Sequence, residues 1–312
     1  MLDPYLVIYN RIPKSGSTSL LRMIDAASKT NHFRHESSRD YMVRNRTDSE
    51  ERAIVNALLE RSVRRRQRLV YDQHMYWIDV AKYARPGEAE RVAFINVVRE
   101  PLSLVGSNFY WRPTQCACVD KPQSWCGPAM VANKQTCGHT LESWFEYNAA
   151  RGVSYTKLLS EVGGMHMSPA FLCGHSASPW QCARESQNSC PAIHDLVRCA
   201  SDGVAAGRYA VVGLMEDVNL TMAVLATTLP AFFGPPFSWR QQVSESAAHI
   251  SKANPLRGPG FNASMATRLS QLPAVQAVQG LYHSLRLRLE GQMRVHQSAE
   301  SMDFILGPKL QK

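Results

Sequence analysis

The stretch from Tyr5 to Leu21 reads YLVIYNRIPKSGSTSLL, and it decides the fold class that the sequence predicts. An apolar and aromatic run typical of a strand precedes a Pro-Lys pair, small hydroxylated residues around Gly16, and an apolar pattern of helical spacing. Small residues let backbone N–H groups approach an oxyanion, the following helix adds its N-terminal N–H groups, and Lys14 adds a full charge. We therefore expect a strand, an anion-binding loop and a helix; the alternative is an ordinary Ser/Gly turn.

Strand-like and helix-like segments alternate along the rest of the chain, which predicts an α/β fold with a central parallel sheet flanked by helices. We expect a single domain over residues 1–312, with Cys-rich loop insertions at about 111–139 and 169–200. Residues 31–46 are expected to form a surface loop with one short strand. The other expected strands are 68–71, 91–98 and 209–214, and the expected helices are 19–27, 47–66, 76–83, one starting near 102, 141–151, 218–229 and 274–295.

The chain is basic, with a formal net charge of +9, and arginines cluster between Arg61 and Arg68. Such a cluster is usually a solvated helix face, and an acidic partner is the alternative. Nucleic acid, an anionic membrane and a polyanionic sugar would all be attracted by this charge. Because the cluster precedes a strand, we expect it at the end of the sheet opposite to any site formed by residues that follow the strands.

Eight cysteines lie in loop-rich sequence without a Cys-x-x-Cys pair, which favours disulfides and an oxidising compartment over a zinc site. Free buried thiols in a cytosolic protein are the alternative. Glycosylation acceptors at Asn45, Asn219 and Asn262 fit a secretory route. No apolar run is long enough to span a bilayer, so we expect membrane attachment only through a segment absent from this chain.

Three predicted strands are followed directly by reactive side chains, namely Lys14, His74 and Arg99. Ligands of parallel sheets bind beyond the carboxyl ends of the strands, so these three side chains are expected to converge on one crevice. Each has a simpler interpretation: a solvated lysine, a packed histidine, or an arginine paired with Glu100. A kinase-type loop is disfavoured because its lysine follows the last glycine, whereas Lys14 precedes Gly16.

These residues carry a resemblance to the family of heparan sulfate 2-O-sulfotransferases and uronyl 2-O-sulfotransferases. The segment Tyr9–Ser19 resembles that family's 5′-phosphosulfate loop, and Ile95–Pro101 with Ser107 resembles its 3′-phosphate motif. The segment from Tyr71 to Asp79 resembles the one that bears the catalytic histidine. The segments 171–176 and 209–233 are also similar in order and character, so the resemblance spans roughly residues 5–233.

The resemblance implies a P-loop-like fold and transfer of a sulfuryl group from 3′-phosphoadenosine 5′-phosphosulfate (PAPS) to a sugar hydroxyl, with no metal. By match to the family motifs, His74 is the catalytic base and Lys14 stabilises the departing phosphate. The expected nucleotide-binding residues are Lys14, Ser15, Gly16, Ser17, Thr18, Ser19, Arg99, Ser107 and Lys252, and the expected acceptor-binding residues are Arg11, His35 and Arg112.

The chain departs from the family pattern at Asp72, where the heparan enzyme has the first histidine of a His-x-His pair. Asp72 therefore either orients His74 or has no role. Cys173 and Cys182 match a family disulfide by position, and we expect a second disulfide between Cys190 and Cys199.

The resemblance further implies an anionic polysaccharide such as heparan sulfate or another glycosaminoglycan as the partner, and no nucleic acid. It also implies the Golgi lumen as the location, with a membrane anchor in the full-length form; a homo-oligomer is compatible with the sequence. Two other functions remain open: a non-catalytic polyanion-binding module of the same fold, and a nucleotide-dependent kinase.

Overall fold

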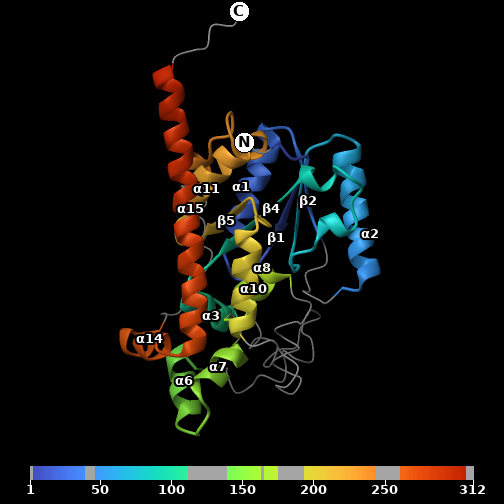
Figure 1. Ribbon diagram of the computed structural model, residues 1–312. Helices are drawn as coiled ribbons and strands as arrows, with labels where there is room; N and C mark the ends of the chain where they lie inside the picture. Colours follow the sequence, from blue (N-terminus) through green and yellow to red (C-terminus); the bar gives the residue numbers. More distant parts are fainter. Residues whose placement is uncertain are drawn as a thin grey trace, which may run out of the picture.

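The computed structural model describes residues 3–38, 46–111, 139–162, 165–174, 193–243 and 261–306. These residues form a five-stranded parallel sheet in the order β2-β3-β1-β4-β5, flanked by helices (Figure 1). The predicted α/β class is thereby confirmed. The strands are β1 (Leu6–Asn10), β2 (Arg34–Ser37), β3 (Leu69–Gln73), β4 (Val92–Val98) and β5 (Val211–Leu214).

The apolar runs of the sequence form the middle of the sheet, because a strand covered on both faces buries every side chain. All five residues of β1 and six of the seven residues of β4 are buried. The short strand expected within residues 31–46 is β2, which pairs with β3 at the edge of the sheet and carries polar, partly exposed side chains.

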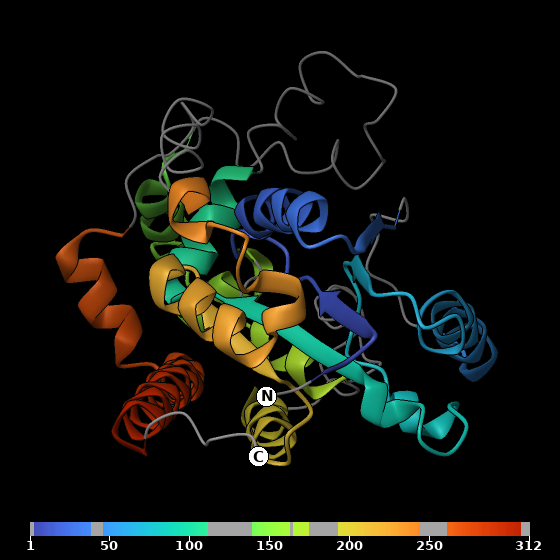
Figure 2. The same ribbon diagram turned by 90° about the horizontal axis from the view of Figure 1, so that it is seen from above.

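Helices cover both faces of the sheet (Figure 2). On one face lie α1 (Ser17–Thr30) and α11 (Val218–Thr228), and α12 (Pro230–Phe233) packs against both. On the other face lie α8 (Met167–Cys173) and α10 (Ile193–Ala205). The long helix α15 (Pro273–Leu306) closes the side of the sheet at β5, where it contacts α10 and α11.

The helix expected over residues 47–66 is present as α2 (Asp48–Leu59), which continues into a π-helical turn (Glu60–Arg64). A capping box starts α2: the Thr47 hydroxyl accepts from the Glu50 N–H, and the Glu50 carboxylate accepts from the Thr47 N–H. Val55, Leu58 and Leu59 are the buried side chains of α2.

The helix expected over residues 76–83 is wrong for most of its length. Only a 3-10 turn forms there (Val80–Lys82), after Asp79, whose side chain accepts from the Ala81 N–H. The Trp77 N–H instead donates to the carbonyl oxygen of Phe171 at 3.1 Å. A tertiary hydrogen bond thus replaces the local helical one. A second 3-10 turn (Ala89–Arg91) leads into β4.

A second hydrophobic cluster lies at the end of the sheet where α3 (Pro101–Trp111) begins (Figure 1). It joins α3 to α6 (Leu141–Ala149), α7 (Tyr155–Val162), α14 (Ala263–Ser270) and the first turns of α15. Aromatic rings pack among the aliphatic side chains of this cluster, and Phe145 and Phe261 meet edge to face with centroids 5.2 Å apart.

The disulfide pairing differs from the expected one. Cys173, at the end of α8, is bonded to Cys199 on α10, so neither the Cys173–Cys182 pair nor the Cys190–Cys199 pair forms. The reason is geometric: α8 and α10 pack side by side on one face of the sheet and bring the two Cα atoms to 5.2 Å. The interval 169–200, expected to be loop, is helical at residues 169–173 and 193–200. The other six cysteines lie outside the described residues.

Within the described part of the chain, no helix combines the length and apolar character needed to cross a membrane. Two of the three glycosylation acceptors lie in this part: Asn219 is exposed in the first turn of α11, and Asn262 is exposed at the start of α14. Asn45 lies outside the described residues.

Candidate functional site

The carboxyl ends of β1, β3 and β4 lie next to one another, and the loop from Arg11 to Gly16 follows the central strand β1. Asn10 is in register with Gln73, and the Arg11 N–H donates to the Gln73 carbonyl oxygen at 2.8 Å. His74 therefore follows β3 directly beside this loop. On the other side, the Arg99 Nη1 atom lies 3.3 Å from the Lys14 carbonyl oxygen and donates to it. The structure thus brings His74, Lys14 and Arg99 to one loop.

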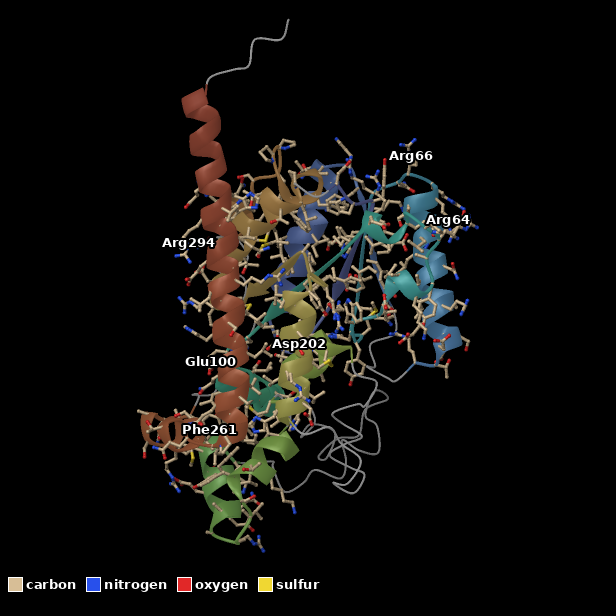
Figure 3. The ribbon with its side chains drawn as sticks, viewed as in Figure 1. Arg64, Arg66, Glu100, Asp202, Phe261 and Arg294 are labelled. Atoms are coloured by element: carbon tan, nitrogen blue, oxygen red, sulfur yellow. A yellow bond between two sulfur atoms is a disulfide. The ribbon has the colours of Figure 1, made fainter. Side chains whose placement is uncertain are left out.

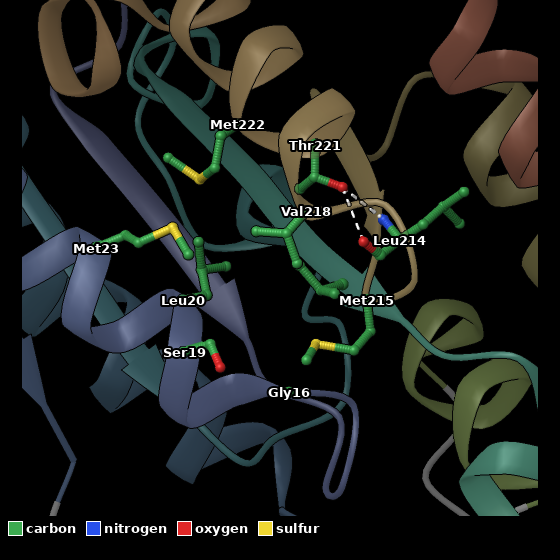
Figure 4. Close-up of a pocket in the computed structure, with 10 residues that line it drawn as sticks. Gly16, Ser19, Leu20, Met23, Leu214, Met215, Val218, Thr221 and Met222 are labelled. Atoms are coloured by element: carbon green, nitrogen blue, oxygen red, sulfur yellow. Dashed lines mark hydrogen bonds between the residues drawn. The ribbon is translucent and has the colours of Figure 1, made fainter. Parts of the chain in front are cut away.

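The loop has an unusual backbone at two positions. Lys14 and Gly16 both have positive φ angles, 64° and 77°. A Cβ atom on Gly16 would overlap the Sδ atom of Met215, which follows β5 (Figure 4). Glycine is therefore required here for two reasons, the left-handed backbone and the close approach of Met215.

The hydroxylated residues of the loop differ in their surroundings. Ser15 is fully buried and its Oγ atom has no hydrogen-bond partner. α1 begins at Ser17, and the Ser19 N–H donates to the Gly16 carbonyl oxygen at 3.0 Å, which leaves the N–H groups of Ser17 and Thr18 without a partner within the helix. Ser17 is half-buried and Thr18 is exposed, whereas Ser19 is buried and lines a small, mainly apolar cavity between α1 and α11 (Figure 4).

The two cations of the site lie close enough to affect each other. Burial lowers the pKa of the Lys14 ammonium, and the nearby positive charge of Arg99 lowers it further. The Arg99 Nε atom lies 3.9 Å from the Oε1 atom of Glu216, which follows β5. An anion bound between Lys14 and Arg99 would relieve their mutual repulsion, as expected of a phosphate-type site.

His74 is 3% exposed, and its Nδ1 atom lies 3.0 Å from the Arg11 carbonyl oxygen. A carbonyl oxygen only accepts hydrogen bonds, so Nδ1 carries the proton of the neutral ring and Nε2 is the basic nitrogen. Burial, together with the positive charge of Arg11, lowers the pKa of His74 to about 4. The ring is consequently neutral at physiological pH, as a general base must be.

Arg11 and His35, expected to face the acceptor, are both bonded to Asp72. The Arg11 Nη1 atom lies 2.5 Å from Asp72 Oδ1, and the His35 Nε2 atom lies 2.7 Å from Asp72 Oδ2. The Ser37 hydroxyl also donates to Asp72, and the His35 Nδ1 atom is bonded to Asp25 on α1. The Arg11 and His35 side chains are only 11% and 8% exposed. Their contact with an acceptor stays a prediction.

The remaining predicted site residues are less closely connected. Ser107 is half-buried on α3, which begins two residues after Arg99. The Glu100 carboxylate accepts from the N–H groups of Leu102 and Ser103 and so fixes the start of this helix. Lys252 and Arg112 lie outside the described residues.

Sequence reasoning missed a buried polar network beneath the loop. The Asn10 side chain donates to the Tyr209 hydroxyl at 2.9 Å and to the Phe171 carbonyl oxygen at 3.3 Å. The Asn96 side chain donates to both oxygens of Asn10. The only available signal was an asparagine near the end of each of two apolar strands. The network fixes the ends of β1 and β4 relative to α8.

The arginine cluster lies at the opposite end of the sheet. Arg64 and Arg66 are found near the end of α2, far from Glu100 at the carboxyl end of β4 (Figure 3). Arg64 is paired with Glu88 at 2.8 Å and with Glu60 at 3.6 Å. The cluster is thus partly neutralised by its own acidic neighbours.

Among the described residues, no group of three His, Cys, Asp or Glu side chains is placed to hold a metal ion. Fold and site together define a class: a parallel α/β protein whose first strand leads into a basic loop, beside a neutral histidine and an arginine. No family model matches the chain.

The chain is similar to curated sulfotransferases. It is 23% identical over 244 residues to the uronyl 2-sulfotransferase homolog pip of Drosophila melanogaster, covering 73% of this chain and 42% of the relative. It is 25% identical over 236 residues to heparan sulfate 2-O-sulfotransferase 1 of Gallus gallus, covering 74% of this chain and 56% of the relative. It is 26% identical over 263 residues to the Xenopus laevis protein of the same name, covering 82% of this chain and 63% of the relative. The resemblance that the motifs predicted is thereby confirmed, and the chain spans about half the length of these relatives.

Proposed function

We propose that this protein is a carbohydrate sulfotransferase of the uronyl 2-O type, which moves a sulfuryl group from PAPS to a hydroxyl of a glycosaminoglycan-like polysaccharide. The observation that carries the proposal is the hydrogen bonding of both His74 and Arg99 to the backbone of the Arg11–Gly16 loop. A base and a cation are thus held on either side of an anion-binding loop. The similarity to named 2-O-sulfotransferases supports the same conclusion.

In the proposed reaction, His74 Nε2 takes the proton of the acceptor hydroxyl while that oxygen attacks the sulfur of PAPS. The bond from sulfur to the bridging phosphate oxygen breaks, and adenosine 3′,5′-bisphosphate leaves. Lys14 offsets the charge that develops on the departing phosphate, and Arg99 with Ser107 binds the 3′-phosphate. The N–H groups at the start of α1 and the Ser15 hydroxyl bind the 5′ end.

We also propose that the acceptor is an anionic polysaccharide and that the protein acts in the Golgi lumen, anchored in its full-length form. The Cys173–Cys199 disulfide and the exposed Asn219 and Asn262 acceptors support an oxidising, secretory compartment. Loss of mass on enzymatic deglycosylation of the expressed protein would test the two acceptors, and imaging of a tagged full-length protein would test the location.

The decisive experiment measures transfer of labelled sulfate from PAPS to desulfated glycosaminoglycans. His74→Ala should abolish transfer and leave binding of adenosine 3′,5′-bisphosphate nearly unchanged, because His74 is assigned to the acceptor hydroxyl. His283→Ala is the matched control, since His283 is exposed on α15. Full activity of His74→Ala would show that the assigned base is wrong.

Two further measurements separate the two other functions. A non-catalytic polyanion-binding module would bind heparin without a PAPS-induced rise in melting temperature. A kinase would require magnesium and ATP, so turnover that persists in chelator would exclude it.

A further inference from the structure

The cations beside His74 are oriented inward, toward a buried carboxylate. Asp72 is 0% exposed and receives hydrogen bonds from Arg11, His35 and Ser37. Both ring nitrogens of His35 are taken, one by Asp72 and the other by Asp25. An acceptor carboxylate or sulfate would have to break one of these bonds to reach the His35 ring.

The charges of this network are mutually satisfied. Burial alone would lower the pKa of His35, but hydrogen bonds to Asp72 and Asp25 outweigh that effect and raise it. Burial alone would raise the pKa of Asp72, but hydrogen bonds from His35 and Ser37 and the charge of Arg11 lower it. The network thus sets an arginine, and a histidine whose protonated form the two carboxylates favour, against those carboxylates, which leaves little net charge to attract an acceptor.

Arg11 links this network to His74 in two ways. Its backbone carbonyl oxygen accepts from His74 Nδ1 at 3.0 Å, and its guanidinium group is held by Asp72 at 2.5 Å. The backbone contact fixes the tautomer of the ring. The charge of the guanidinium group opposes protonation of the His74 ring, whereas the charge of Asp72 favours it.

We propose that Arg11 is a positioning residue for His74, that Asp72 holds Arg11 in this role, and that His35 completes the internal network instead of contacting the acceptor. This inference rests on the proposed function, in which His74 is the base. It assigns a role to the aspartate that replaces the first histidine of the family pattern. It also makes the acceptor subsite beside His74 less cationic than the presence of Arg11 and His35 indicates.

The test combines kinetics with nuclear magnetic resonance titration of labelled histidines in the ligand-free protein. In Arg11→Gln, loss of the guanidinium charge should raise the pKa of His74 and move the acid limb of the kcat profile upward by about one pH unit. The KM for desulfated heparan-type polysaccharide should stay within about twofold, a smaller change than loss of a typical charged hydrogen bond produces. Arg11→Lys should preserve the acid limb, and Arg34→Gln, an exposed arginine on β2, is the matched control.

Asp72→Asn leaves a buried arginine without its carboxylate and risks misfolding, so the double variant Arg11→Gln/Asp72→Asn is included. Because Arg11 acts on His74 more strongly than Asp72 does, the double variant should also show a raised His74 pKa. An unchanged His74 pKa in both Arg11→Gln and the double variant would overturn the proposal. So would a tenfold rise in acceptor KM with an unchanged acid limb, which would identify Arg11 as an acceptor contact. If the wild-type protein transfers no sulfate, the proposed function fails, while the titration still decides whether Arg11 and Asp72 control His74.

Discussion

The backbone carbonyl oxygen of Arg11 accepts a hydrogen bond from Nδ1 of His74, so the loop that follows β1 sets the tautomer of the side chain that follows β3. The adjacent parallel strands β1 and β3 thereby both help to position the His74 ring. The contact exists because Asn10 and Gln73 are in register, which places the next residue of each strand side by side. A shift of this register would remove the base from the loop.

Acid should destabilise the protein through His74. The folded-state pKa of about 4 lies below the usual 6.5, so between these values the unfolded chain binds a proton that the folded protein does not. The stability that the neutral His74 ring contributes is fully present above pH 6.5 and is lost as pH falls toward 4. The free energy of unfolding should fall by about 3 kcal/mol over this range. Urea unfolding across this range should show a flatter pH dependence for His74→Gln than for the wild type. The same pH dependence of the free energy of unfolding in both proteins would contradict the low pKa of His74.

Gly16→Ala should weaken both stability and nucleotide binding. The new methyl group would overlap Met215 and also strain the left-handed backbone, so we expect a loss of about 2–4 kcal/mol in the free energy of unfolding. Gly87→Ala is the matched control, because Gly87 has a φ of 80° but no atom near its added Cβ. Thermal and urea unfolding would measure the difference between the two variants. Met215→Ala should partly rescue Gly16→Ala, and no rescue would show that the overlap is not the cause.

Cys199→Ser should destabilise the protein by about 2–4 kcal/mol, because it removes the covalent link between α8 and α10. The Phe171 carbonyl oxygen, which accepts from Asn10 and Tyr209, lies on α8, so nucleotide binding should weaken as well. Urea unfolding and calorimetric titration with adenosine 3′,5′-bisphosphate would measure both effects. Peptide mapping under non-reducing conditions provides the control; a Cys173–Cys182 peptide in the wild type would refute the observed pairing.

Glu216→Gln should strengthen binding of adenosine 3′,5′-bisphosphate about two- to fivefold at low salt, since it removes a negative charge next to Arg99. The glutamine carbonyl oxygen can still accept from the Glu100 N–H, and its NH2 group can donate to the Tyr282 hydroxyl oxygen, so the local structure should persist. Calorimetric titration would measure the change, and the gain should shrink in high salt. Weaker binding in the variant would show that Glu216 orients Arg99 rather than competing with the nucleotide.

The sequence was sufficient for features whose causes are local. The apolar runs of β1 and β4, the capping box of Thr47 and Glu50, and the reactive residues after the strands all follow from short-range patterns. The strand order is not local, and it alone places His35 on the edge strand beside Asp72. The pairing of Cys173 with Cys199 likewise depends on the packing of two helices, which spacing does not reveal.

The segment after His74 shows the limit of helical patterns. Its apolar spacing predicted a helix, yet the Trp77 N–H is bonded to α8 and the Gly174 Cα packs against the Trp77 carbonyl group. Tertiary contacts outweighed a weak local preference. Such contacts involve residues far apart in the sequence and so leave no trace in the local pattern.

The central position of β1 has a consequence for how the chain is made. Of the five strands of the sheet, β1 is synthesised first, but its partner strands begin only at Leu69 and Val92, and β5 joins the sheet only at Val211. Until β3 emerges, the nascent chain carries an apolar strand with both hydrogen-bonding edges open, and one edge stays open until β4 emerges, a state prone to aggregation. Chaperone dependence should therefore be greatest before Val98 emerges, and premature stops that retain β1 but lack β4 should yield insoluble products.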